Sequence, residues 1–304
     1  MRKIYPFLVV LLLLSGCAKL SEEKRAQKAR EYYSEGLRAF REGDYGDAAW
    51  NFGEALKFMD WLTPSQIENA KFLLGKSHYL DKNFVEAVVA LEDYIFYYPK
   101  LHRTQEAYYM LVDSYIKVSP DPYRDQEYTW KAIEKAKEFL SKFPGSPYAQ
   151  KIKNLIDTAY TKIAKHEYLI AKFYEDYGYT YSAALRYRDL LINFPGYVSE
   201  KEVAYRYIRS MILVEKQVRL VKDRLNDLIE KAESKLKKAR GEGEKIAIKK
   251  RIEFLNREIE RWENIKRKAR EDVKEALSRY KEVYGENPYY RELIRLLSEK
   301  GWKS

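Results

Sequence analysis

A fixed spacing between small residues and alanines constrains the fold of this chain more than any other feature. An interval of twelve residues recurs between Gly36 and Ala48, Gly75 and Ala87, and Ala171 and Ala183. An aromatic or aliphatic residue follows each alanine by four positions: Phe52, Leu91 and Tyr187. A glycine inside a helix costs about 1 kcal/mol relative to alanine, so its presence indicates close packing. The spacing therefore predicts pairs of helices that cross at the small residues.

The same intervals match the tetratricopeptide pattern of about 34 residues, in which a proline closes each unit. Pro99 and Pro195 close two units, and further units are expected to end at Pro144 and Pro288, with Ser114 and Ser210 as their small residues. The sequence thus predicts an all-α fold, a tetratricopeptide-repeat superhelix of five helix pairs. The alternative, a set of unrelated amphipathic helices, does not explain a fixed period. With 13 Gly and 9 Pro in 304 residues, turns are also too few for a β-architecture.

The fifth unit contains a long insertion between its two helices. Apolar residues recur there at intervals of three and four on both sides of Gly241 and Gly243: Val218, Val221, Leu225, Leu228 and Ala232, then Ile248, Ile252, Leu255, Ile259 and Trp262. This pattern predicts an antiparallel helical hairpin with a coiled-coil seam at 219–270. The hairpin holds 18 Lys and Arg against 10 Asp and Glu. One interpretation is a cationic surface that approaches anionic lipids or an acidic partner protein. The alternative is a coiled coil whose charges are only solvated.

The N-terminus has the order of a lipoprotein signal. Arg2 and Lys3 precede an apolar run at 4–14, which is shorter than the roughly 20 residues of a transmembrane helix and ends on Leu14-Ser15-Gly16-Cys17. This ending resembles a bacterial lipobox, whose cysteine is acylated; the alternative is a core helix with a chance cysteine. The predicted segments are a signal peptide at 1–16, a lipidated linker at 17–25, repeats at 26–218, the hairpin at 219–270, and the last repeat helix with a C-terminal helix at 271–304.

Composition excludes several classes of function. Cys17 is the only cysteine, so its acylation leaves no thiol for a disulfide, a nucleophile or a zinc cluster. The net charge of +11 comes from interleaved acids and bases, and a periplasmic protein meets no genome, so no nucleic-acid partner is expected. His78, His102 and His166 lack the spacing of metal ligands or a catalytic triad. We expect no enzyme, no metal and no cofactor.

Several stretches resemble the BamD family, the tetratricopeptide outer-membrane lipoproteins of the β-barrel assembly machinery. They are Phe143-Pro144-Gly145-Ser146-Pro147-Tyr148-Ala149, the helix at 164–174, Tyr179-Thr180-Tyr181-Ser182-Ala183-Ala184, Phe194-Pro195, and Asn287-Pro288-Tyr289-Tyr290-Arg291. The resemblance runs from about Ala26 to Leu297, and the hairpin departs from the family. It implies a scaffold in the outer membrane, lipid-anchored and facing the periplasm, that binds unfolded outer-membrane proteins. The alternative is a tetratricopeptide pilot lipoprotein for a pilus or secretion pore.

The first helices of the first two units carry the residues expected to line a concave groove. They are Arg30, Tyr33, Leu37, Phe40, Arg41, Asn69, Phe72, Lys76 and Tyr79. An aromatic floor with a cationic rim suits an extended peptide that is aromatic and ends in a carboxylate. The resemblance implies the same ligand, the last strand of a nascent outer-membrane protein. The alternative is that these aromatic side chains only pack between repeats.

A second surface is expected in the C-terminal half. The resemblance implies that the last repeats hold the barrel-forming subunit of the assembly machinery. Lys201 lies at the start of the fifth unit's first helix, where this contact is expected, with Tyr205 and Arg206 beside it. The alternative for Lys201 is a solvated lysine at a helix start.

Overall fold

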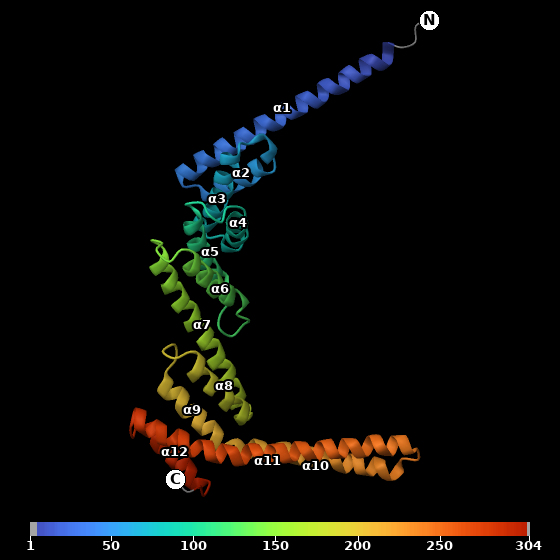
Figure 1. Ribbon diagram of the computed structural model, residues 1–304, viewed down its shortest axis with the longest axis vertical. Coiled ribbons are helices and arrows are strands. Elements are labelled where there is room, and N and C mark those ends of the chain that lie inside the picture. The colour runs from blue at the N-terminus through green and yellow to red at the C-terminus, as the bar shows by residue number, and fades with distance from the viewer. Residues whose placement is uncertain (1–4, 303–304) are drawn as a thin grey trace. The chain divides into compact units, whose positions relative to one another are not determined.

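Helices form all of the regular secondary structure that this computed structural model describes, which covers residues 5–302 (Figure 1). The all-α prediction is confirmed for these residues. The elements are α1 (Tyr5–Glu42), α2 (Tyr45–Leu56), the 3₁₀ turn η1 (Met59–Trp61), α3 (Pro64–Leu80), α4 (Phe84–Tyr97), α5 (Thr104–Val118), α6 (Glu127–Lys142), α7 (Ala149–Asp176), α8 (Thr180–Asn193), α9 (Glu200–Ile212), α10 (Val214–Lys238), α11 (Glu242–Tyr284) and α12 (Pro288–Glu299).

Side chains are described from residue 21 onward, so the side chains of the predicted signal peptide and of Cys17 lie outside the described part. Among the described residues, no helix combines the length and the apolar character that crossing a bilayer requires.

The chain forms two compact units, residues 1–160 and 161–304, and the boundary falls within α7. In the first unit α1 packs on α2, α3 on α4, and α5 on α6. Its largest core cluster surrounds Tyr94, Tyr108 and Phe139. In the second unit α9 packs on α8, α11 and α12, and the core includes Ile208 and Tyr280. Each unit therefore buries apolar side chains of its own.

Local signals in the sequence set where several helices begin. Thr63 accepts a hydrogen bond from the backbone N–H of Gln66, whose side chain accepts one from the backbone N–H of Thr63, so the two form a capping box. The Asn287 side chain caps α12 by accepting hydrogen bonds from the backbone N–H groups of Tyr289 and Tyr290, and Pro288 is the first residue of the helix. The turn before α2 contains Gly43 at φ +85°, in the left-handed region that glycine adopts without strain.

The small residues lie where paired helices touch, as the spacing predicts. A Cβ atom on Gly36 would lie 2.9 Å from the ring of Phe52 on α2. One on Gly75 would lie 2.7 Å from Cδ2 of Leu91 on α4. Both distances are shorter than real carbon contacts, so only glycine allows these helices to approach so closely.

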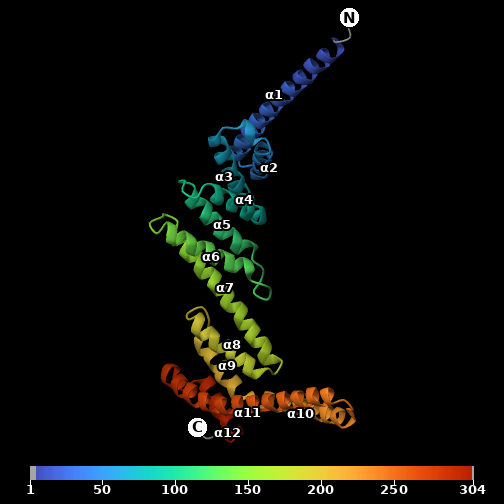
Figure 2. The same cartoon turned by 45° about the vertical axis from the view of Figure 1, so that its right-hand side comes forward.

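The helices α10 and α11 form the feature called here the arm, residues 219–270. They lie side by side and run antiparallel, because Glu215 pairs with Arg270 and Lys222 pairs with Glu263 (Figures 1 and 2). All ten apolar residues of the predicted seam are buried or half-buried. Both helices extend past the predicted limits: α10 begins at Val214, and α11 continues without a break to Tyr284. No loop separates the arm from the helix that packs on α9.

Candidate functional site

Hydrogen bonds between successive first helices of the pairs form a ladder with a span close to 34 residues. In the first unit the ladder joins α1 to α3 and α3 to α5; in the second it joins α7 to α9. Its members are Tyr33 and Asn69, Asn69 and Arg103, Tyr79 and Asp113, Tyr168 and Glu202, and Glu175 and Arg209. Four of these spans are 34 residues and the first is 36, which is the interval expected between equivalent positions of neighbouring tetratricopeptide units.

The predicted groove residues of α1 form a half-buried surface. Tyr33, Leu37 and Phe40 pack against the small core cluster around Phe52, and each keeps part of its side chain accessible. The Tyr33 hydroxyl accepts a hydrogen bond of 2.8 Å from Nδ2 of Asn69. These contacts hold the apolar side chains of α1 in place at the surface.

Phe72 lies beneath this surface. Its side chain is 3% exposed, and its ring packs against Tyr94 in the core. The Lys76 ammonium and the Arg103 guanidinium lie 5.7 and 5.1 Å from its ring centroid. Phe72 therefore packs in the core, as in the alternative that these aromatic side chains only pack between repeats. Its ring lies beside two cations, Lys76 and Arg103.

The polar groove residues differ in how firmly they are held. Lys76 pairs with Glu106 at 2.8 Å, and the Tyr79 hydroxyl donates to Asp113 at 2.8 Å. Burial and this hydrogen bond raise the pKa of Tyr79, so its hydroxyl stays protonated. Arg30 and Arg41 are exposed and make no salt bridge with any described residue. These two arginines are available to an anionic ligand.

Arg103 belongs to this surface, although the sequence did not identify it. Its Nη1 donates to Oδ1 of Asn69 at 2.5 Å while its guanidinium lies over Phe72. The available signal was the repeat itself, because Arg103 follows Asn69 by 34 residues.

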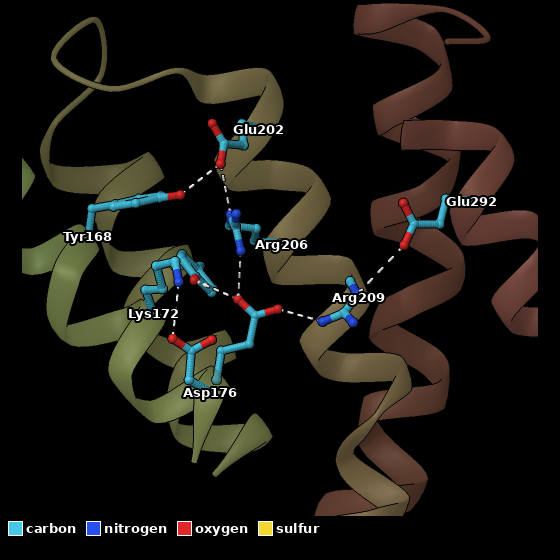
Figure 3. A network of polar contacts seen from close by, with 9 residues as sticks. Tyr168, Lys172, Asp176, Glu202, Arg206, Arg209 and Glu292 are labelled. Atoms are coloured by element: carbon cyan, nitrogen blue, oxygen red, sulfur yellow. Dashed lines mark hydrogen bonds and ion pairs between the residues drawn. The ribbon is translucent and has the colours of Figure 1, made fainter. Parts of the chain in front are cut away.

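The predicted partner surface on α9 contains a buried polar network (Figure 3). Glu175 of α7 is at its centre, with a side chain only 7% exposed. It accepts hydrogen bonds from Arg206 at 3.0 Å, Arg209 at 2.5 Å and the Tyr187 hydroxyl at 2.8 Å. Arg209 also approaches Glu292 of α12 at 3.9 Å. The network thus connects α7, α8, α9 and α12.

Glu202 extends the network toward the start of α9. It accepts hydrogen bonds from the Tyr168 hydroxyl at 2.7 Å and from Nε of Arg206 at 2.9 Å. The Tyr168 bond, followed by the contact with Arg206, lowers the pKa of Glu202. Arg206 is therefore engaged within the unit.

The other two predicted partner residues differ in exposure. Tyr205 is buried and stacks on Tyr289 of α12, with ring centroids 4.5 Å apart. Lys201 is exposed and makes no salt bridge among the described residues. Of the three residues, Lys201 is exposed, Arg206 is half-buried and Tyr205 is buried.

The described residues contain no group of three or more His, Cys, Asp or Glu side chains placed to hold a metal ion. His78 is half-buried in the first unit, and its burial lowers the pKa of its imidazole.

Helix pairs whose first helices contact one another at a recurring interval of about 34 residues define a helical-repeat protein. Residues 25–225 match the family model described as "YfiO: Outer membrane lipoprotein", and the chain belongs to this family. It is 52% identical over 303 residues to the "Putative outer membrane protein assembly factor BamD" of Aquifex aeolicus (strain VF5), covering all of this chain and 98% of that relative.

Two more distant relatives each match about two thirds of this chain. The "Outer membrane protein assembly factor BamD" of Rickettsia prowazekii is 26% identical over 208 residues, covering 68% of this chain and 82% of that relative. The protein of the same name from Caulobacter vibrioides is 22% identical over 213 residues, covering 68% of each chain. These comparisons confirm the resemblance to the BamD family. The family model ends at residue 225, so most of the arm lies beyond it. The match to the A. aeolicus relative nevertheless covers the whole chain, so the expectation that the hairpin departs from the family does not hold for that relative.

Proposed function

We propose that this protein is a non-catalytic scaffold lipoprotein that acts in outer-membrane β-barrel protein assembly. Its relatives, one of them similar over the full length, are named as assembly factors. The observation that carries the proposal is the face of α1 and α3, where half-buried apolar side chains lie near unpaired arginines. In this proposal the helices form five tetratricopeptide pairs, with the arm inserted in the last pair.

The ligand of the first unit is an extended C-terminal segment of an unfolded outer-membrane protein. Tyr33, Leu37 and Phe40 contact its aromatic side chains, and the exposed Arg30 and Arg41 attract its terminal carboxylate. Asn69, Lys76 and Tyr79 keep α3 in register with α1 and α5 through their hydrogen bonds and ion pairs. Phe72 supports this face from the core.

The barrel-forming subunit of the machinery binds the second unit at α9. Lys201 makes the direct contact, while Tyr205 and Arg206 hold α9 against α12 and α7. Affinity purification from a detergent extract separates this function from a pilot role, since a barrel-forming subunit should co-elute rather than a pilus or secretion pore. Co-elution of a pore alone would contradict the proposal.

Replacing both groove arginines should weaken binding of a carboxylate-ended peptide. The variant combines Arg30→Gln and Arg41→Gln, and the peptide ends in phenylalanine with either a free or an amidated C-terminus. We expect about tenfold weaker binding of the free carboxylate and little change for the amide, because only the former presents a charge to the arginines. Fluorescence anisotropy measures both.

The matched control is Lys100→Gln with Lys117→Gln, two exposed lysines of the same unit that lie outside the groove. The control should bind both peptides as the unmodified protein does. An equal loss for the free and the amidated peptide, or an equal loss in the control, would place the carboxylate elsewhere.

Cys17 carries the lipid anchor in this proposal, and the protein faces the periplasm. Cys17→Ser should leave an unprocessed precursor that lacks acyl chains, since the thiol is the acylation site in a lipobox. Labelling with a radioactive fatty acid and membrane fractionation measure this result. A normally processed, membrane-bound and labelled product would show that the anchor lies elsewhere. Several acyl chains anchor a protein far more firmly than one chain does.

A further inference from the structure

The positive charge of the arm is concentrated at its tip, defined here as residues 231–251. The tip holds nine Lys and Arg residues against three Asp and Glu, a net charge of +6. The remainder of the arm, 219–230 and 252–270, holds nine against seven, a net charge of +2. A solvated coiled coil has no need for such an uneven distribution along its length.

The two parts of the arm also use different cations. The tip has seven lysines and two arginines, whereas the remainder has three lysines and six arginines. Arginine suits fixed bidentate pairing with carboxylates, while lysine is a flexible, strongly hydrated point charge. Lysine at the tip therefore favours a diffuse anionic surface over a geometrically specific protein contact.

Ion pairing is also uneven: two of the nine tip cations pair with a carboxylate, against five of the nine in the remainder. Near the base Lys222 and Lys266 pair with Glu263, and Arg270 pairs with Glu215. At the tip seven exposed cations make no salt bridge with any described residue: Lys235, Lys237, Lys238, Arg240, Lys249, Lys250 and Arg251. They lie on the end of α10, on the connecting turn and on the start of α11. The charge thus surrounds the end of the arm.

Apolar side chains accompany these cations. Ile246, in the first turns of α11, is 48% exposed. Leu236 and Ile248 are half-buried nearby; Gly241 lies in the turn between the helices, and Gly243 lies in the first turn of α11. Exposed aliphatic side chains among lysines are typical of segments that bind the interfacial region of a bilayer.

We propose that the tip of the arm binds the anionic headgroup surface of a lipid bilayer, with Ile246 entering the headgroup layer. Lysine side chains near such a surface each add to the attraction, which decreases with ionic strength. Figures 1 and 2 show the tip at the end of the arm farthest from α9 and α12, so the tip does not pack against the core of the second unit. The membership of the chain in an outer membrane lipoprotein family provides a bilayer as its surroundings.

The test measures vesicle binding of the mature chain, residues 17–304 with Cys17→Ser so that no acyl chain contributes. Vesicles contain phosphatidylglycerol with phosphatidylethanolamine, or phosphatidylcholine alone. The tip variant combines Lys237→Glu, Lys238→Glu, Lys249→Glu and Lys250→Glu. The control combines Lys216→Glu, Arg219→Glu, Arg224→Glu and Lys268→Glu, which are exposed, lie near or at the base of the arm, and change the net charge equally.

We expect at least about tenfold weaker binding of the tip variant to the anionic vesicles and less than about threefold for the control, on the basis of the attraction per lysine. Binding of the unmodified chain should decrease with salt and be far weaker on phosphatidylcholine, and Ile246→Asn should also weaken it. Circular dichroism checks helicity. If the glutamate variant loses helicity, the same four positions are replaced by glutamine, and a loss of several fold is then expected.

Three results would overturn the proposal. Equal losses for both variants would show that total charge alone governs binding. Equal binding to both kinds of vesicle would exclude headgroup charge. Unchanged vesicle binding of the tip variant, with loss of an acidic protein that co-purifies with the unmodified chain, would identify a protein as the partner.

Discussion

Glu175→Ala is expected to lower the free energy of unfolding of the second unit by about 3 kcal/mol, because it leaves two half-buried guanidinium groups and the hydroxyl of the buried Tyr187 without their shared carboxylate. Arg206, Arg209 and the Tyr187 hydroxyl all donate to Glu175, whose side chain is almost fully buried. Urea unfolding followed by circular dichroism measures the total loss. Hydrogen exchange of α9 measures the local opening.

Asp176→Ala is the matched control one residue further along α7. Asp176 pairs with Lys172 at 3.0 Å, but its side chain is 57% exposed, so the loss should be below about 0.5 kcal/mol. If Glu175→Ala lowered the free energy of unfolding as little as Asp176→Ala does, the network would not stabilise the unit. Because α9 also carries Lys201, the Glu175 variant should lose partner binding along with the order of α9.

Gly75→Ala is expected to destabilise the first unit by about 2 kcal/mol, even though alanine is the better helix former. The added Cβ would lie 2.7 and 2.9 Å from side-chain atoms of Leu91, a residue with no exposed surface. Leu91 cannot move without disturbing the core, and overpacking costs about 1–3 kcal/mol. Urea unfolding measures the change.

The same substitution at Gly53 should have the opposite effect on the free energy of unfolding. Gly53 lies inside α2, and a Cβ there would meet no atom within 4 Å. Gly53→Ala is therefore expected to stabilise the protein by about 0.5–1 kcal/mol through helix propensity. Stabilisation by both substitutions would show that the approach of α3 to α4 does not require glycine.

Periodic features of the fold were predictable because they depend on residue spacing alone. Gly36 and Gly75 lie at helix crossings, and the arm buries its predicted seam. The limits of the arm were not predictable in the same way. Residues 270 and 271 lie in mid-helix, and Ala269 and Val273 are both buried, so the apolar pattern continues across the expected boundary.

Side-chain roles in the candidate sites were harder to predict, because each depends on a partner in another helix pair. The spacing predicts that Phe72 lies on the first helix of its pair, but its burial against Tyr94 and Arg103 is a property of two pairs together. Glu175 carries no local signal, since its partners lie on other helices. The 34-residue interval is the one sequence feature that relates Glu175 to Arg209.

The absence of a loop between α9 and α10 gives the arm a mechanical property. Leu213, the single residue between them, has helical dihedrals, and the backbone N–H of Lys216 donates to its carbonyl oxygen. The 43-residue α11 then returns from the tip to α9. The arm is thus a lever whose short end packs against the helix carrying Lys201. We expect a force on the tip to act on α9 through these helices. Any coupling between binding at the tip and binding at Lys201 must then act equally in both directions.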